Sequence, residues 1–416
     1  MQMKSVAKIV VIIFGVILFA AALTLAGFAL IPPESYEPKP RDLRDESEYQ
    51  LEEKVGWYVF DDNSHRMITW GAEKALTINR FDSLARNHLT PKTVDTFIWL
   101  RKGDRENYQM KFKRNENGNV VGMEWTDEGG QERTARRLRN YNYAQQEVRY
   151  FNGDTELVGL LMKPVVPGPH PAVAFIHGSG VSDRNNFWYL YQADYLAKSG
   201  VEVLLPDKRG CGKSGGTWHD ASFADFAGDA LAAVDYLKNS EAVDTDKIGL
   251  LGISQGGWIG PLAASKSSDV RFLINVSGSA TTVNEQLSHE ITADIRNAGI
   301  PGFMASLIEP VFSRRVKKRR EIWWEQNGNF DPLPYWRKLK LPILVVYGKK
   351  DEDDNVPVSR SVSFLEAAKS ASQNPHFHIK VYEESGHAMG DPSTGWIRHD
   401  YLEMLADWIH QITATN

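Results

Sequence analysis

The sequence predicts an α/β fold: a doubly wound, mostly parallel sheet with a helical lid insertion, preceded by a small β-rich domain and an N-terminal transmembrane helix. Three observations predict it. Apolar runs of strand length alternate with helix-like segments through the last two thirds of the chain, as in βαβ units. Residues 252–256 form the pentapeptide Gly-Ile-Ser-Gln-Gly directly after one such run. Two later runs end in an acidic loop and in a loop that carries His387.

The N-terminal segment, residues 1–31, has the properties of a membrane anchor. Residues 9–31 contain no charged side chain, and as a helix rising about 1.5 Å per residue they would span a hydrocarbon core of about 30 Å. A cleaved signal peptide is the alternative, because alanines at 20–22 follow an apolar stretch of suitable length. Cleavage there would leave residues 23–31 as an exposed apolar tail. We therefore expect an uncleaved anchor, and Lys8 beside it favours an N-terminus inside and a remaining chain that is periplasmic or extracellular.

The next segments differ in composition from both neighbours. Residues 32–53 are rich in proline and charge and are predicted to form a linker. Residues 54–145 contain short aromatic and apolar stretches that end in turn signals, such as 57–60 before Asp-Asp-Asn and 120–125 before a Gly-Gly turn. They predict a small β-rich domain whose expected role is to pack against the following domain or to hold it away from the membrane.

Residues 146–416 are predicted to form one α/β domain. The stretches 172–176 and 201–205 are apolar and of strand length, and the stretch 186–199 between them has a helical pattern. Residues 222–225, Ser-Phe-Ala-Asp, match a capping box at the start of another helix. Strands that alternate with helices in this way imply a parallel sheet.

An insertion at about residues 279–338 interrupts this alternation. It lies between predicted strands at 272–276 and 342–348 and contains helix-like stretches, including 308–325. Its position predicts a helical lid over the functional site. Four aromatic side chains in it fit either an acyl pocket or ordinary packing: Phe303, Phe312, Trp323 and Trp324.

The pentapeptide 252–256 places Ser254 between a strand-like run and a glycine-rich segment that can open a helix. A serine in a sharp strand-to-helix turn is lifted clear of the sheet and becomes a nucleophile. Glycines flank such a turn because it leaves no room for β-carbons. A chance match is the alternative for an isolated pentapeptide, so the downstream residues carry the argument.

A serine nucleophile needs a base, and the base needs a carboxylate that orients it. Both follow Ser254 in the required order. The predicted strand 342–348 ends in an acidic loop, and the predicted strand 377–382 ends in the loop of His387. Serine, then acid, then histidine is the chain order of triads that use this kind of turn. The order therefore favours a catalytic triad. The alternative interpretation is a solvated acidic loop and an unrelated structural histidine.

An oxyanion hole should follow an earlier strand. Residues 177–180, His-Gly-Ser-Gly, follow the strand at 172–176, and small residues there allow backbone N–H groups to approach an oxyanion. We assign the donors to Ser179 and Gln255, and the alternative for the first donor is a residue one position away. His177 is expected to hold the loop by hydrogen bonding.

The chain from about residue 150 to 416 resembles an α/β-hydrolase of the dienelactone hydrolase and prolyl-oligopeptidase-like group. The matching segments are 177–180, 207–214, 252–257, 355–357 and 386–387. Where the family usually has one acid before its Val-Pro pair, this loop holds Asp351, Asp353 and Asp354. Counting from the strand favours Asp351, and counting back from Pro357 favours the other two. We choose Asp351 because it lies nearest the stiff strand end.

The resemblance and the triad together imply a serine hydrolase that cleaves esters or related acyl bonds of a small-molecule substrate. A peptidase of the prolyl-oligopeptidase kind is the alternative within enzymes, less favoured because residues 54–145 are too few for a propeller. A non-catalytic binding protein of the same fold is the alternative outside them. We expect no cofactor and no metal, and the sequence does not predict an oligomeric state.

Composition adds exclusions. With 42% hydrophobic residues and a formal net charge of −5 over 416 residues, the chain is globular and mildly acidic, which gives no bulk reason to bind nucleic acid. The basic run 314–320 is one short block and is expected to be a solvated helix face. The segment 207–214 is expected to be a tight ion-paired loop. Cys211 within it is the only cysteine, which excludes an intrachain disulfide.

Overall fold

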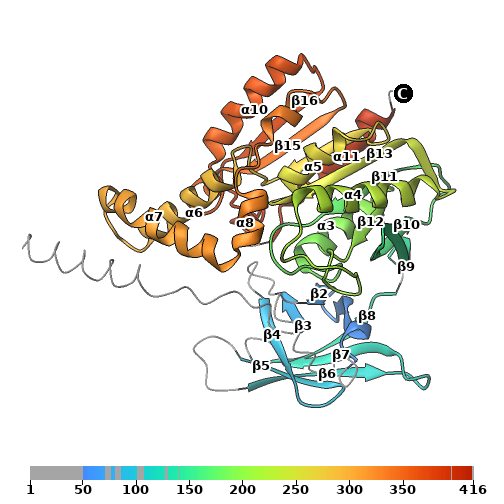
Figure 1. Cartoon of the computed structure of the whole chain (residues 1–416). Helices are drawn as coiled ribbons and strands as arrows, with labels where there is room; N and C mark the ends of the chain where they lie inside the picture. Colours follow the sequence, from blue (N-terminus) through green and yellow to red (C-terminus); the bar gives the residue numbers. More distant parts are fainter. Residues whose placement is uncertain are drawn as a thin grey trace, which may run out of the picture. The chain divides into compact units, whose positions relative to one another are not determined.

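The computed structural model describes residues 50–70, 76–79, 86–100, 107–126, 130–139, 141–394 and 396–414 (Figure 1). One compact unit among these residues is Thr282–Phe330, and the rest of the described chain belongs to the other.

The larger unit contains an eight-stranded sheet in the order β16-β15-β14-β13-β11-β12-β10-β9 (Figure 1). Its strands are β9 (Tyr143–Asn152), β10 (Thr155–Pro164), β11 (His170–Ile176), β12 (Glu202–Pro206), β13 (Val243–Ile253), β14 (Phe272–Val276), β15 (Ile343–Gly348) and β16 (Phe377–Tyr382). All pairs from β12 to β16 are parallel, whereas β9 and β10 form an antiparallel hairpin at the edge. The predicted mostly parallel sheet is confirmed, and the edge hairpin has no counterpart in the prediction.

The strand order reverses beside β11, because the chain passes from β11 to β12 on one side and later to β13 on the other. A reversal of this kind opens a crevice at the carboxyl ends of the strands, where ligands bind in α/β folds. The loop after β11 and the turn after β13 begin at Ile176 and Ile253. The topology therefore brings the sequence-predicted oxyanion loop and Ser254 to one place.

Six helices of the larger unit accompany this sheet: α3 (Phe187–Lys198), α4 (Phe223–Lys238), α5 (Gly256–Ala264), α9 (Leu333–Trp336), α10 (Val358–Ser372) and α11 (His399–Ala414). α3 and α11 share one apolar core with β11 and β13, and α4 packs against α5 and β13. The predicted capping box is confirmed, since the Ser222 hydroxyl accepts from the backbone N–H of Asp225 and the Asp225 carboxylate accepts from that of Ser222. These helices fix the strand ends that carry the site.

The β-rich domain is a closed barrel of eight antiparallel strands (Figure 1). They are β1 (Gly56–Phe60), β2 (His65–Trp70), β3 (Leu76–Asn79), β4 (Arg86–Pro91), β5 (Thr96–Leu100), β6 (Asn107–Arg114), β7 (Val120–Thr126) and β8 (Glu132–Arg137). Each pairs with the next, and β1 pairs with β8 to remove the sheet edges. Buried side chains including Tyr58, Phe97 and Trp125 form its core. The short 3₁₀ helix η1 (Glu52–Lys54) precedes it.

The smaller unit is helical: α6 (Val283–Asn297), α7 (Gly302–Arg319) and α8 (Glu321–Asn327). α6 and α7 pack through an apolar cluster that contains Leu287, Ile291 and Ile308. Of the predicted pocket aromatics, Trp323 is buried and Trp324 packs against this cluster, whereas Phe303 and Phe312 are exposed. The insertion is helical as predicted, and its role as a lid stays a prediction.

No helix of the described chain has the length and apolar character needed to cross a membrane. The predicted anchor at residues 9–31 and most of the predicted linker lie outside the described residues.

Candidate active site

Ser254 occupies the sharp turn between β13 and α5. Its backbone φ is +56°, in the left-handed region that non-glycine residues rarely adopt. The backbone N–H of Ser254 donates to the Val276 carbonyl oxygen at 2.9 Å, which ties the turn to the end of β14. A β-carbon on Gly256 would lie 2.7 Å from the Ile176 carbonyl oxygen, so only glycine fits beside the end of β11. Strain at a single position held by such contacts is typical of functional sites.

Asp351 and His387 form a hydrogen-bonded pair. Nδ1 of His387 lies 2.7 Å from Oδ2 of Asp351. Asp351 is fully buried in the 3₁₀ helix η2 (Lys349–Asp353) directly after β15, and the His387 side chain is 22% exposed. An imidazole that donates Nδ1–H to a carboxylate has its Nε2 lone pair available to accept a proton. The pair is therefore arranged as a base with its orienting acid.

The other two candidate acids lie differently. Asp353 and Asp354 are exposed on the same loop, beyond the buried Asp351. The loop can approach His387 closely because Gly348, the last residue of β15, has no side chain. A β-carbon there would collide with the carbonyl oxygens of the histidine loop. The first acid after the strand is thus the one that the fold brings to the imidazole.

The serine and the pair are connected through the end of β14. Ser277 follows Val276, the acceptor of the Ser254 N–H, and the Ser277 hydroxyl donates to the His387 carbonyl oxygen at 2.9 Å. Within the part of the chain that the structure describes, no hydrogen bond joins the Ser254 hydroxyl to His387. Catalytic hydrogen bonds are often long without substrate and shorten in the Michaelis complex. The three residues therefore lie at neighbouring strand ends without a completed relay.

The loop 177–180 carries the first of the two predicted oxyanion donors. The backbone N–H of Gly178 donates to the Tyr189 hydroxyl oxygen at 2.8 Å, so that group is engaged elsewhere. This contact disfavours a shift of the donor from Ser179 to Gly178. Gln255, which carries the second proposed donor, is 5% exposed and stands between Ser254 and the first residue of α5.

His177 is held as a structural residue. Its Nε2 lies 2.7 Å from the Pro206 carbonyl oxygen, and its Nδ1 lies 2.9 Å from the Ser182 hydroxyl. Burial lowers the pKa of His177 to about 3, so the ring is neutral at physiological pH. Both ring nitrogens are occupied, which supports a loop-holding role over that of a base.

The loop after β12 is ion-paired, as predicted, and the partners of its side chains lie outside the loop. The Asp207 carboxylate accepts from the backbone N–H groups of Arg184 and Lys213 at 3.0 and 2.8 Å. The Arg209 guanidinium instead pairs with Asp229 on α4, with Nε 2.9 Å from the carboxylate. Sequence proximity suggested a partner within the loop, and the fold supplies one from another element.

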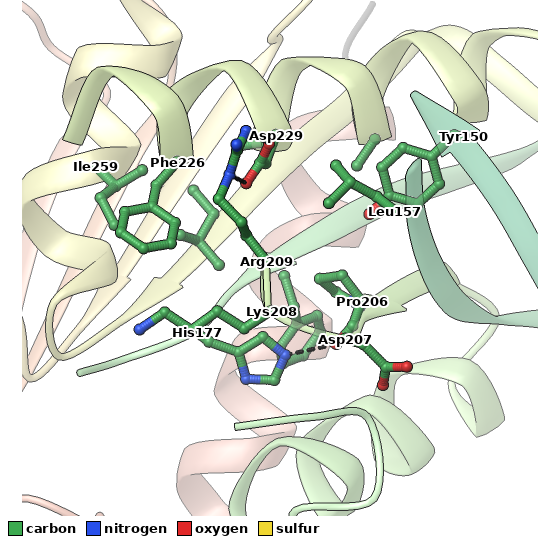
Figure 2. Close-up of a pocket in the computed structure, with 14 residues that line it drawn as sticks. Tyr150, Leu157, His177, Pro206, Asp207, Lys208, Arg209, Phe226, Asp229 and Ile259 are labelled. Carbon is green, nitrogen blue, oxygen red and sulfur yellow. Dashed lines mark hydrogen bonds and ion pairs between the residues drawn. The ribbon is translucent and has the colours of Figure 1, made fainter. Parts of the chain in front are cut away.

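A cavity of about 40 Å³ lies beside this loop (Figure 2). Figure 2 shows the Arg209–Asp229 pair, His177 and Lys208 around it. Neither Ser254 nor His387 lines it, and it is far smaller than pockets that hold substrates. We therefore do not assign it to a substrate.

Two side chains near the site were not predicted from the sequence as functional residues. Tyr189 reaches the oxyanion loop from α3, eleven positions from its partner Gly178. Lys208 reaches the same loop from the end of β12. Lys208 lies in the matching segment 207–214, but its contact with this loop, like that of Tyr189, depends on the tertiary structure. Among the described residues, no group of histidine, cysteine and carboxylate side chains could hold a metal ion.

Comparison with known proteins finds relatives of the α/β domain. Residues 187–415 match the prolyl oligopeptidase family, a span that includes Ser254, Asp351 and His387. Dipeptidyl-peptidase 5 of Porphyromonas gingivalis is 31% identical over 248 residues, which cover 58% of this chain and 34% of that protein. The acylamino-acid-releasing enzyme of Rattus norvegicus is 25% identical over 285 residues, covering 64% of this chain and 35% of that enzyme. The chain thus spans about a third of the length of these curated relatives.

A solved esterase from Pyrococcus furiosus shares the fold, with a TM-score of 0.50 and 19% sequence identity. The likeness covers 65% of this chain and 92% of that one. At this identity it is a likeness of fold alone.

Proposed function

Since the chain belongs to the prolyl oligopeptidase family of α/β-hydrolases, we propose that it is a serine hydrolase that cleaves carboxylic esters or related acyl bonds of small-molecule substrates. The observation that carries the proposal is the contact of 2.7 Å between His387 and the buried Asp351. It orients a base at the edge of the sheet where Ser254 stands in its strained turn.

The proposed reaction has two halves. In the first, Ser254 Oγ attacks the acyl carbonyl carbon while His387 Nε2 removes the hydroxyl proton. The tetrahedral oxyanion accepts hydrogen bonds from the backbone N–H groups of Ser179 and Gln255. It collapses to an acyl-enzyme, and the imidazolium gives its proton to the leaving oxygen. In the second half, water attacks the acyl-enzyme in the same way and releases the acid and Ser254.

Asp351 acts through the imidazole. A buried carboxylate on Nδ1 keeps the proton on that nitrogen, so Nε2 faces the serine as an acceptor. The same carboxylate stabilises the imidazolium that forms once the serine proton has moved.

A peptidase is the second candidate, and the 31% identity to a dipeptidyl-peptidase favours it. Its chemistry differs in the leaving group, because an amide nitrogen must be protonated before it departs. The specificity of such a peptidase also depends on groups that hold the peptide amine.

The two candidates differ in their rates on matched substrates. We expect the purified protein to hydrolyse p-nitrophenyl esters of short acyl groups with a larger kcat/KM than aminoacyl or dipeptidyl p-nitroanilides, with chromophore release as the readout. Faster cleavage of the anilides would make the chain a peptidase. Cleavage of neither, with no labelling by a fluorophosphonate, would make it a non-catalytic protein of the same fold.

We also propose that residues 9–31 anchor the protein and place the hydrolase domain in the periplasm or outside the cell. The support is the uncharged segment itself. Full-length protein should then sediment with membranes and remain there after carbonate extraction, with its N-terminus intact. N-terminal sequencing that begins after Ala22 or Ala29 would contradict the anchor and indicate a cleaved signal peptide.

A further inference from the structure

Lys208 is a buried lysine that joins the two halves of the proposed oxyanion site. It follows the end of β12 by two residues and is 6% exposed. Its Nζ donates to the carbonyl oxygens of Gly178 at 2.7 Å and Gly180 at 3.1 Å, and to the side-chain oxygen of Gln255 at 3.1 Å. An ammonium group has three N–H donors, and here three oxygens receive them.

The bond to Gly178 fixes the direction of a proposed oxyanion donor. The Gly178 carbonyl and the Ser179 N–H belong to the same peptide unit, which is planar and trans, so they point in opposite directions. A side chain that holds this carbonyl on one side of the loop therefore turns the Ser179 N–H toward the other. The bond to the Gly180 carbonyl oxygen holds the loop at a second point, two peptide units further along.

The bond to Gln255 ties the second donor to the first. Gln255 follows Ser254 directly. Its side-chain oxygen accepts a hydrogen bond from the Lys208 ammonium group, which also donates to the loop carbonyls. The loop after β11 and the turn after β13 are separate elements, so their spacing depends on contacts of this kind. A donor that misses the oxyanion position by a fraction of an ångström loses much of its effect.

The Lys208 ammonium group lies among loop oxygens and aromatic rings. Its neighbour Arg209 pairs with Asp229, whereas the Lys208 side chain extends away from that pair (Figure 2). Its Nζ lies 4.9 Å from the centre of the Phe226 ring. Burying an ammonium group costs free energy unless its hydrogen bonds are made. If position 208 served packing alone, an apolar side chain would avoid this cost.

We propose that Lys208 is a positioning residue that holds the N–H groups of Ser179 and Gln255 at the oxyanion position and polarises the Gly178 peptide toward it. A hydrogen bond from a cation to a carbonyl strengthens the donor at the other end of that peptide. The inference rests on the proposed function, since it names a residue that prepares the same site. It assigns Lys208 no contact with the substrate.

The test compares transition-state with ground-state binding. Lys208→Met keeps the length of the side chain and removes all three donors. We expect kcat for a p-nitrophenyl ester to fall about 10- to 100-fold, somewhat less than the loss on deleting an oxyanion donor outright, while KM changes less than about threefold. The affinity for a trifluoromethyl ketone, which forms the tetrahedral adduct, should fall by the same factor as kcat/KM.

Lys213→Met is the matched control. Lys213 lies on the same loop, but its side chain is 44% exposed and pairs with Glu147 at 2.6 Å. We expect this variant to keep the wild-type kcat, KM and inhibitor affinity. Equal activity of Lys208→Met and wild type would overturn the inference and leave the proposed function standing. An inactive, unlabelled wild-type protein would instead refute the proposed function.

A second variant keeps the test decisive where Lys208→Met does not fold. Gln255→Met leaves Lys208 and its loop contacts in place and removes one acceptor. The kcat of Gln255→Met should fall about threefold to tenfold. Where Lys208→Met does fold, the double variant should lose less kcat than the product of the two single losses, as for coupled residues. Unchanged kcat and ketone affinity in Gln255→Met, or full additivity of the two losses, would count against the inference.

Discussion

In the Ser254→Ala variant, turnover of every ester substrate should fall by about 10⁶, the scale of loss for a deleted nucleophile in other serine triads. The variant loses the only atom that can form the acyl-enzyme, whereas the turn itself needs only a small side chain. Alanine at φ +56° carries about the same backbone strain as serine. We therefore expect an unchanged circular dichroism spectrum and a melting temperature close to that of the wild type.

Ser265→Ala provides the control for this result. Ser265 follows the last residue of α5, and its hydroxyl donates to the Leu262 carbonyl oxygen at 2.8 Å. The Ser265→Ala variant removes a hydroxyl at the other end of α5 and should leave kcat/KM unchanged. Turnover in Ser254→Ala within tenfold of wild type would assign the nucleophile to another residue.

Asp351→Asn should lower kcat by about 10⁴, as in the worked serine-protease template, because an amide no longer holds the imidazole in the productive tautomer. An asparagine can present its NH₂ to Nδ1, which then accepts and leaves the proton on Nε2. It also provides no charge to stabilise the imidazolium. Steady-state kinetics at saturating ester measures this loss directly.

Asp353→Asn and Asp354→Asn are the matched controls on the same loop. Both aspartates are exposed, whereas Asp351 is fully buried against His387. We expect each control to retain kcat within about threefold, since solvent screens the charge of an exposed aspartate from His387. If either control lost activity while Asp351→Asn kept it, the acid would be assigned wrongly although the reaction would be the same.

The sequence predicts the positions of Ser254, Asp351 and His387 because each depends on local signals. A glycine on either side of Ser254 marks a turn without room for β-carbons, and a buried apolar run before Asp351 marks a strand that ends at it. Parallel strands end at one edge of a sheet, so residues that follow separate strands meet there. A local signal also predicts the capping box at Ser222, from the sequence Ser-Phe-Ala-Asp at 222–225, and the structure confirms it.

Other features depend on contacts between distant residues and leave no local mark. Closure of the barrel requires β1 to pair with β8, and no turn in the sequence links those strands. Arg209 pairs with Asp229 on α4 instead of with Asp207, which the loop composition suggested. Lys208 belongs to the same class, because its three acceptors come from two other elements. Only the arrangement of the strands brings these groups together.

The most direct test of the proposed chemistry is to locate the covalent adduct of a fluorophosphonate. The wild-type protein should gain the mass of one phosphonyl group per chain, and peptide mapping should place it on the fragment that contains Ser254. The Ser254→Ala variant should gain none under the same conditions. An adduct on a different residue, or ester hydrolysis by a wild-type protein that never becomes labelled, would contradict a nucleophilic Ser254.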